Sequence, residues 1–452
     1  MSSEKEKEKS RRINSLPFLV YKEPDENQFG GYTRLVVKKV IIASCFFSTD
    51  SNMLTEIVSY LPISKLVLFL FVIFVLVFAY RRDLKETMNS IFAIVYCAVL
   101  LCHRLPYAFL SHITGKIVKQ KYTQPDLRQR FISVTVKTAC ETLPLWIIRI
   151  LFHISGVYEQ MANGLFFGKL RNQWCRSVSG TEWQGYLIGE NAETAEIGED
   201  ADLVIIYAHG GGFVCGGALI SLVVFVDWIK SWKISHGAKT HIVSLEYGLS
   251  PEHPFPAARD MFLQCYHTLV NEKGISPSKI VFAGDSAGGN TATIASFELL
   301  NNPSKYSVPQ PSRLLLISPV LTALKISRTF KTNEAYDCLS KQWFDRCLSN
   351  YIYGTNLLPT CPMISPLYER RFKGLPRTWI CVGSYELFLD DITLFIEKAR
   401  SQDVEAEIVV EENNSHNYAI LYPLSRDGGA QRAVKYMSKF LFGELPIRKI
   451  TN

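Results

Sequence analysis

The chain has 452 residues, of which 48% are hydrophobic and 12% aromatic, and it carries a formal net charge of +7. This composition excludes a disordered protein, and the spread of basic residues along the chain argues against nucleic acid as a partner. The 11 cysteines include no CxxC pair and no Cys/His cluster at zinc spacing, so no structural metal is expected. One disulfide among Cys338, Cys347 and Cys361 is compatible with their spacing.

Residues 1–60 are expected to form a polar tail and a juxtamembrane segment. Residues 61–80 follow with a mostly apolar stretch whose single charge is Lys65, and this length suffices to span a bilayer. We therefore predict a single transmembrane helix over 61–80, with membrane lipid as a partner. A second apolar run, 91–102, is too short to span a bilayer by itself, and the sequence leaves open whether it also inserts.

The charges around residues 61–80 leave the orientation open. Arg81, Arg82 and Lys85 follow the segment closely, and by the positive-inside rule they place its C-terminal side in the cytosol. More distant basic residues, in the tail and at positions 34, 38 and 39, weaken this assignment.

Two further regions differ in their patterning. Residues 91–170 contain the second apolar segment and then amphipathic helices with aromatic faces, whereas β-rich runs alternate with helical stretches over 171–445. This alternation predicts an α/β fold with a mostly parallel central sheet that helices cover on both faces. The predicted strands are WQGYLI, LVIIYA, THIVSLEY, KIVFAG, RLLLIS, RTWICVG and EAEIVVEE.

The run KIVFAG leads directly into GDSAGGN, residues 284–290, and then into the helical TATIASFELL. This is a GxSxG motif in a strand-turn-helix context, in which the serine hydroxyl is exposed at the apex of a sharp turn. The sequence therefore predicts that Ser286 is a nucleophile.

A second glycine cluster, His209-Gly210-Gly211-Gly212, follows the run LVIIYA. Glycines leave backbone N–H groups unshielded, and such groups stabilise the oxyanion that forms when a serine attacks an acyl carbonyl. We predict an oxyanion hole made of the amides of Gly210, Gly211, Gly212 and Ala287, with His209 as an associated motif residue. The alternative is a phosphate-binding loop, but no GxxxxGK[ST] or GxGxxG pattern is present.

A serine nucleophile needs a base that a carboxylate orients. His416, in NNSHNYAI, follows the last predicted strand and is the expected base. The acid is expected after TWICVG, where SYELFLDD offers Glu386 nearest the strand end and Asp390 as the alternative. Asp390 and Asp391 are expected in the first turn of the next helix, where carboxylates commonly offset the helix dipole.

The segments HGGGF, YGLSPEHPFPAA, GDSAGGN, SYELFLDD and SHNY together resemble the hormone-sensitive-lipase-like branch of the α/β-hydrolases, over roughly residues 170–445. The resemblance implies an α/β-hydrolase fold with a helical cap, built from N-terminal helices and from an insertion at about 320–376. The family usually has Asp-Pro-Leu where this chain has Glu386-Leu387-Phe388, which implies glutamate as the acid. Gly248 replaces a family arginine, so any salt bridge made by that arginine is expected to be absent, and Glu252 and His253 are expected to be loop scaffold.

An N-terminal anchor joined to this module is similar to arylacetamide deacetylase and most similar to fungal sterol deacetylases of the endoplasmic reticulum. This similarity implies a carboxylic ester hydrolase that removes acetyl groups from sterols or similar lipophilic alcohols, without a cofactor and on the lumenal side of the membrane. Two alternatives stay open: a lipase for longer-chain cholesteryl or acylglycerol esters, and a non-catalytic small-molecule receptor on the same fold. The sequence does not indicate the oligomeric state.

Overall fold

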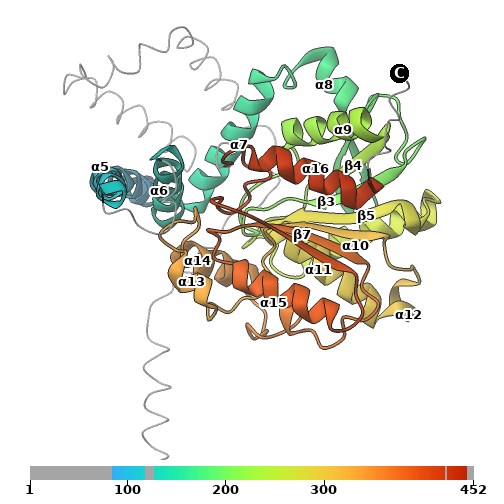
Figure 1. Cartoon of the computed structure of the whole chain (residues 1–452). Helices are drawn as coiled ribbons and strands as arrows, with labels where there is room; N and C mark the ends of the chain where they lie inside the picture. Colours follow the sequence, from blue (N-terminus) through green and yellow to red (C-terminus); the bar gives the residue numbers. More distant parts are fainter. Residues whose placement is uncertain (1–83, 118–126, 423–424, 445–452) are drawn as a thin grey trace, which may run out of the picture. The chain divides into compact units, whose positions relative to one another are not determined.

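An eight-stranded sheet forms the centre of the part of the chain that the computed structural model describes, residues 84–117, 127–422 and 425–444 (Figure 1). The predicted membrane helix 61–80 lies outside these residues. The strands in chain order are β1 (Cys175–Gly180), β2 (Trp183–Ile188), β3 (Leu203–Ala208), β4 (Thr240–Leu245), β5 (Ile280–Asp285), β6 (Arg313–Ile317), β7 (Arg377–Gly383) and β8 (Ala406–Glu411).

The strand order is β1-β2-β4-β3-β5-β6-β7-β8, and the six strands from β4 to β8 in this order run parallel. The strands β1 and β2 form an antiparallel hairpin, which also pairs antiparallel with β4. The seven predicted strands are therefore present, and the predicted mostly parallel sheet is confirmed. Strand β1 escaped prediction because its sequence, CRSVSG, has no apolar run.

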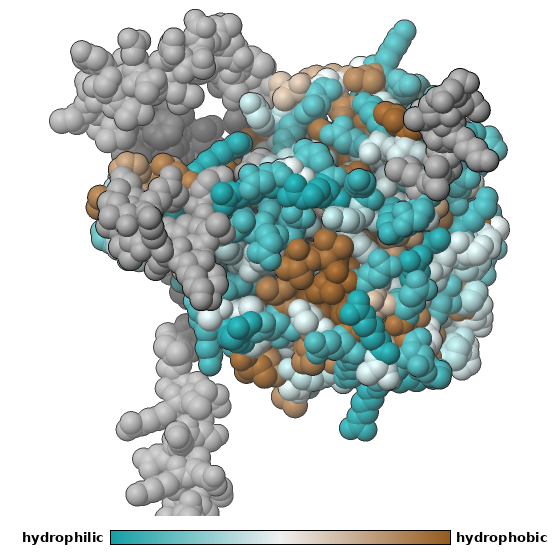
Figure 2. Space-filling view, viewed as in Figure 1, coloured by the Kyte–Doolittle hydropathy of each residue, from teal (hydrophilic) through white to brown (hydrophobic). Residues whose placement is uncertain are grey.

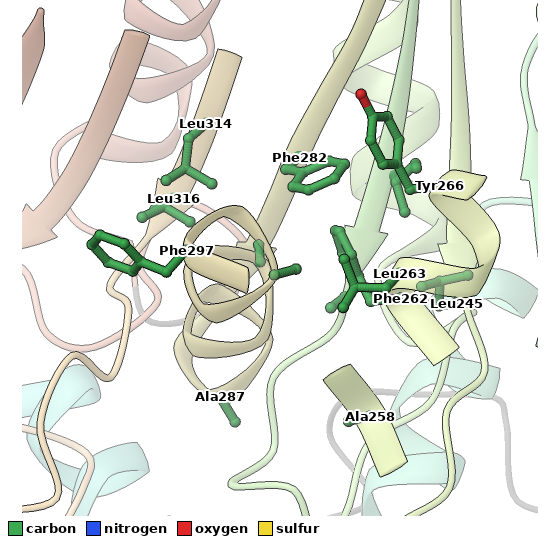
Figure 3. Packing of buried hydrophobic residues seen from close by; sticks show 14 of the residues in the cluster. Leu245, Ala258, Phe262, Leu263, Tyr266, Phe282, Ala287, Phe297, Leu314 and Leu316 are labelled. Carbon is green, nitrogen blue, oxygen red and sulfur yellow. The ribbon is translucent and has the colours of Figure 1, made fainter. Parts of the chain in front are cut away.

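Each central strand sends alternate side chains into two cores, as the twofold repeat of a strand requires. In β3, Val204, Ile206 and Ala208 enter one core, whereas Leu203, Ile205 and Tyr207 enter the other. Such strands are buried on both faces, which explains why their sequences are continuously hydrophobic. In the first core, Phe282 of β5 packs edge to face against Phe262 and Tyr266, with ring centroids 4.8 and 4.7 Å apart (Figure 3).

Helices cover both faces of this sheet (Figure 1). Helices α10, α11 and α15 supply side chains to the first core, and α9 and α16 supply them to the second. The helices after residue 167 are α8 (Gly168–Trp174), α9 (Leu222–His236), α10 (Ala257–His267), η2 (Thr268–Glu272), η3 (Pro277–Lys279), α11 (Ser286–Asn301), α12 (Pro303–Tyr306), α13 (Arg328–Thr332), α14 (Lys341–Tyr351), η4 (Pro366–Tyr368), α15 (Leu389–Arg400) and α16 (Gly429–Phe442).

Within the described residues, the short helix α8 and three longer helices precede the sheet: α5 (Leu84–Ile117), α6 (Leu127–Thr142) and α7 (Leu145–Ala162). The predicted apolar run 91–102 lies within α5, and helical residues on both sides of it extend the apolar stretch. The stretch Glu86–Leu110 has a mean hydropathy of 1.7 and is long and apolar enough to cross a membrane. Core helices of soluble proteins and signal sequences share this length and composition. Figure 2 shows hydrophobic side chains on the visible part of α5. Its most exposed large apolar residues are Phe92, Val99, Tyr107 and Leu110.

The N-terminal helices pack against the segment between β6 and β7. A buried cluster contains Cys97 of α5, Cys140 of α6, Ile148 of α7 and Trp343 of α14. Cys215, from the loop after β3, belongs to the same cluster. The two segments that were expected to form a cap therefore contact each other and reach the glycine loop after β3.

Candidate active site

The parallel strands place the predicted site residues together, because their carboxyl ends meet at one edge of the sheet. The glycine cluster follows β3, Ser286 follows β5, Glu386 follows β7 and His416 follows β8. Ser318, directly after β6, completes the row.

Ser286 sits at a sharp turn between β5 and α11, and its φ of 51° is in the left-handed region. The flanking glycines are required by close approach of the backbone. A Cβ on Gly288 would lie 1.9 Å from the carbonyl oxygen of Ala208, and one on Gly284 would lie 2.5 Å from the backbone of Gly288. The strained turn and its two glycines have the form of a nucleophile elbow.

Ser286, His416 and Glu386 form a continuous hydrogen-bonded chain. The Oγ of Ser286 lies 2.9 Å from Nε2 of His416, and Nδ1 of His416 lies 2.9 Å from Oε2 of Glu386. All three side chains are buried, with exposures of 6%, 3% and 0%. This arrangement matches the nucleophile, base and orienting acid of a catalytic triad.

Two further donors fix the carboxylate of Glu386. Its Oε1 accepts hydrogen bonds of 2.6 Å from the hydroxyl of Ser318 and 2.6 Å from the amide of Gly383. Asp390 lies elsewhere, in the first turn of α15, where its carboxylate accepts from the amide of Thr329 at 3.0 Å and pairs with Arg328. The geometry therefore brings Glu386, and not Asp390, to the imidazole.

Burial and charge act in opposite directions on His416. Burial alone lowers the pKa of the imidazole, but the hydrogen bond and negative charge of Glu386 outweigh it, so the net pKa is raised above the ordinary value. Burial raises the pKa of Glu386, and its hydrogen bond to His416 counteracts this. A raised pKa suits a base that must hold a proton during the reaction and release it afterwards.

The predicted oxyanion loop contains both paired and unpaired amides. The amide of Gly210, which was predicted to face the oxyanion, donates to Oδ1 of Asp285 at 2.8 Å and is already engaged. Within the described residues, the amides of Gly211 and Gly212 have no hydrogen-bond acceptor. Both glycines have positive φ, 112° and 63°, and Ala287 provides an amide in the first turn of α11.

His209 holds this loop rather than reaching the serine. Its ring stacks on Tyr247 with centroids 4.1 Å apart, and its Nδ1 lies 2.7 Å from the carbonyl oxygen of Gly210. Burial lowers the pKa of His209 to about 4, so the ring is neutral near pH 7.

Sequence reasoning missed Asp285 as a second anchor of the site. Besides the Gly210 amide, its carboxylate accepts from the hydroxyl of Tyr207 at 2.9 Å and from the side-chain amide of Asn417 at 2.6 Å. These bonds join the oxyanion loop, the nucleophile turn and the base loop. Its position next to Ser286 was the only available signal.

Arg149 of α7 is a second residue that the sequence did not reveal. It pairs through two nitrogens with Glu252, at 2.7 and 2.6 Å, and donates to the carbonyl oxygens of Val214 and Ser250, both at 2.8 Å. The loop in which Gly248 stands in place of the family arginine is therefore held by an arginine from helix α7. No sequence motif marks this contact.

The structure also bears on the cysteines and on metal binding. Within the described residues all cysteines are free, including Cys338, Cys347 and Cys361, so the compatible disulfide is not formed. No group of His, Cys, Asp or Glu side chains in this part of the chain has the arrangement of a metal site.

A family model described as an α/β-hydrolase fold matches residues 205–420, which include the glycine cluster, Ser286, Glu386 and His416. An esterase of Acinetobacter venetianus is 32% identical over 220 residues, or 48% of this chain and 68% of the relative. The chain belongs to the α/β-hydrolase family.

Further similarities extend this assignment. An acetyl-hydrolase of Streptomyces hygroscopicus is 27% identical over 52% of this α/β-hydrolase and 74% of the relative. A crystal structure of a hormone-sensitive lipase from a metagenome library superposes with a TM-score of 0.57 at 23% identity, covering 71% of this chain and 98% of that one. The predicted α/β-hydrolase fold is confirmed.

Proposed function

We propose that this α/β-hydrolase is a serine carboxylesterase that uses Ser286, His416 and Glu386 as its catalytic triad. The observation that carries the proposal is the unbroken chain from Oγ of Ser286 to Nε2 of His416 and from Nδ1 to Oε2 of Glu386, with both distances 2.9 Å. The similarity to proteins named esterase and acetyl-hydrolase supports the same reaction class.

The hydrogen-bonded chain supports an acylation step in which each of the three residues has one role. As Oγ of Ser286 attacks the ester carbonyl carbon, Nε2 of His416 takes the hydroxyl proton, and Glu386 stabilises the resulting imidazolium. The carbonyl oxygen becomes an oxyanion, for which the amides of Gly211, Gly212 and Ala287 are the candidate donors. When the tetrahedral intermediate collapses, the bond to the alcohol oxygen breaks and the imidazolium protonates that oxygen.

Deacylation repeats this sequence with water as the nucleophile. His416 takes a proton from water, the resulting hydroxide attacks the acyl-serine, and the imidazolium returns the proton to Oγ of Ser286 as the carboxylic acid leaves. The step requires no redox chemistry, and we expect no cofactor.

We further propose acetyl esters of sterols or of similar lipophilic alcohols as substrates. Three observations support this class: the resemblance of the sequence motifs to sterol deacetylases, the similarity to a named acetyl-hydrolase, and the apolar helix α5 within the same chain. Aromatic side chains beside the glycine loop add to the apolar surroundings, since Phe213 stacks on Tyr351 with ring centroids 3.5 Å apart. Apolar and aromatic surroundings of this kind suit a bulky hydrophobic alcohol.

From the resemblance to sterol deacetylases alone, we also propose a protein of the endoplasmic reticulum membrane with its catalytic domain on the lumenal side. The candidate anchors are residues 61–80, from their sequence, and α5, from its length and hydropathy. Protease protection of sealed microsomes tests the sidedness: a lumenal domain resists digestion until detergent is added, whereas a cytosolic domain is degraded at once.

A fluorophosphonate probe tests the reaction itself, because it bonds covalently to an activated serine. We expect the full-length chain to be labelled, Ser286→Ala to be unlabelled, and hydrolysis of p-nitrophenyl acetate to be lost with the label. A non-catalytic receptor would remain unlabelled. Comparing acetyl with oleoyl esters of cholesterol then separates a deacetylase from a longer-chain lipase, since only the lipase would prefer the oleoyl ester.

A further inference from the structure

A fully buried carboxylate, Asp337, lies between the two loops that carry the acid and the base. Its Oδ1 accepts from the backbone amide of His416 at 3.1 Å and from that of Cys338 at 2.7 Å. Its Oδ2 accepts from the backbone amide of Leu387, the residue after Glu386, at 2.8 Å. One side chain with 0% exposure therefore bonds to the backbone of both loops.

The chemistry of these contacts requires a carboxylate. All three partners are N–H donors, and only an ionised carboxyl group presents acceptors on both of its oxygens. An asparagine at 337 would satisfy one side, but its NH₂ group would face the N–H of Leu387 or of His416. Asn333, in the same segment, complements this arrangement by donating its side-chain amide to the carbonyl oxygens of Ser384 and Glu386 at 3.1 and 3.0 Å.

A lysine from the N-terminal helices lies beside this carboxylate. Lys137 of α6 donates to the backbone carbonyl of Glu334, three residues before Asp337. Burial lowers the pKa of Lys137, and the negative charge of Asp337 is the largest influence opposing that shift. Helix α6 therefore places a positive charge next to segment 333–338, whose side chains bond to the loops of Glu386 and His416.

The charges around His416 and Asp337 come from several elements. Three carboxylates act on the imidazole: Glu386 after β7, Asp337 before α14 and Asp285 at the end of β5. Around Asp337 the titratable groups are His416, Glu386, the thiol of Cys338, Lys137 of α6, and Glu334 with its ion-pair partner Lys341. Glu141 of α6 also acts on Lys137, but Asp337 is the strongest of the negative charges that do so.

We propose that Asp337 is a positioning residue of the hydrolytic reaction, which sets the separation of His416 and Glu386 by bonding to both of their loops, while Lys137 supplies the opposing charge. The inference rests on the proposed function, because it assigns a role within the same triad. It also makes α6 a part of the catalytic framework: a helix that precedes the α/β-hydrolase core contributes an electrostatic partner to the site.

Two substitutions test the proposal through the pH dependence of kcat/KM. Activity rises with pH as His416 loses its proton, so the acid limb reports the pKa of this imidazole. Asp337→Asn removes a negative charge near His416, and we expect the acid limb to move to lower pH by about half a unit. Because the loops lose one hydrogen bond, we also expect kcat to fall about tenfold with little change in KM.

Lys137→Met is expected to move the acid limb in the opposite direction. Removing the cation leaves the negative field of Asp337 unopposed at His416, so the limb shifts to higher pH, and Lys137→Arg restores it. Two matched controls each remove one member of a nearby ion pair: Asp345→Asn in α14, and Lys325→Met at its partner. Neither control is expected to move the limb.

The proposal fails if the acid limbs of Asp337→Asn and Lys137→Met coincide with that of the unsubstituted chain and only the thermal midpoints fall, because a purely structural role has that signature. Should Asp337→Asn not fold, the Lys137→Met and Lys137→Arg pair decides alone, by the presence or absence of a reversible upward shift. Ser286→Ala separates this outcome from failure of the proposed function. If Ser286→Ala stays active, the triad itself is wrong; if it is inactive while the limbs are unmoved, only the role of Asp337 is wrong.

Discussion

The nucleophile turn and the N-terminal helices contribute to the same site in contrasting ways. Around Ser286 the chemistry follows from local sequence, since a strand, a turn with two glycines and a helix occur within about twenty residues. Helices α6 and α7 carry no motif, yet Lys137 and Arg149 reach the segment holding the triad and the loop after the glycine cluster. Motifs therefore point to the groups that we propose to react, whereas distant side chains hold the loops on which these groups lie.

This contrast predicts that substitutions at the proposed reacting groups abolish activity with little effect on stability. Substitutions in the helices are expected to lower stability and to reduce activity only in part. The largest effect in the comparison should come from the acid. Glu386→Gln keeps the size of the side chain but removes the charge that stabilises imidazolium, so we expect kcat to fall on the order of 10³-fold. Steady-state hydrolysis of p-nitrophenyl acetate measures the loss.

Asp390→Asn is the matched control for the acid, because it neutralises a carboxylate four residues away that bonds to Thr329 and not to His416. We expect at most a small change in kcat. If Asp390→Asn proved the more damaging of the two, the acid would have to be reassigned. The pH profile of the activity that Glu386→Gln retains should also have its acid limb at lower pH than that of the unsubstituted chain. The reason is that the charge that raises the pKa of His416 is gone.

A second large effect is expected in the glycine loop. A Cβ on Gly212 would lie 2.3 Å from Sγ of Cys347, at a φ of 63°. Gly212→Ala should therefore displace the loop and its amides, and we expect kcat to fall on the order of 10²-fold, as for loss of an oxyanion donor.

The double variant Gly212→Ala with Cys347→Ala isolates the cause of this loss, because it removes the sulfur that the new methyl group meets. We expect it to regain part of the lost activity. Activity as low as in the single variant would mean that the backbone conformation, and not the contact with Cys347, requires glycine.

The sequence predicted the parts of the site that local rules govern. Ser286 follows from its strand-turn-helix context, and Glu386 and His416 follow from their positions after β7 and β8. The engagement of Gly210 by Asp285 was not predictable, because it depends on a contact between residues 75 positions apart. Arg149 and Asp337 escaped for the same reason: both act on backbone groups of distant loops, and a backbone partner leaves no sign in the sequence.

Arg149 provides an intermediate test of the comparison. Arg149→Met removes bonds to two carbonyl oxygens and to Glu252, so we expect the free energy of unfolding to fall by about 2–4 kcal/mol and kcat to fall several-fold. Arg149→Lys should restore little, because an ammonium group cannot reproduce the paired contacts of a guanidinium. Urea denaturation and steady-state kinetics give the two values.

Arg176 is the matched control for Arg149. Its side chain also donates to two carbonyl oxygens, those of Ala192 and Ala195, but it lies on β1 at the far edge of the sheet. Arg176→Met should lower stability without lowering kcat. A loss of kcat equal to that of Arg149→Met would show that the effect of Arg149 is general destabilisation and not an action on the oxyanion loop.

The smallest effect is expected at Tyr207, whose hydroxyl donates to the buried Asp285. Burial raises the pKa of Asp285, and the hydrogen bonds from Tyr207 and Gly210 counteract this by favouring the ionised form. Tyr207→Phe should therefore lower the free energy of unfolding at neutral pH by about 1.5 kcal/mol, more than Tyr266→Phe, whose hydroxyl donates to the neutral carbonyl of Pro309.

The pH dependence of that difference identifies its origin. The bond from Tyr207 favours the carboxylate, so its contribution is complete above the pKa of Asp285 and is lost as the pH falls through that value. The two tyrosine variants should then become equally stable in acid. If Tyr207→Phe were the less stable at every pH, Asp285 would not carry its charge in the folded chain, and the anchor joining the glycine loop, the nucleophile turn and the base loop would be a network of neutral hydrogen bonds.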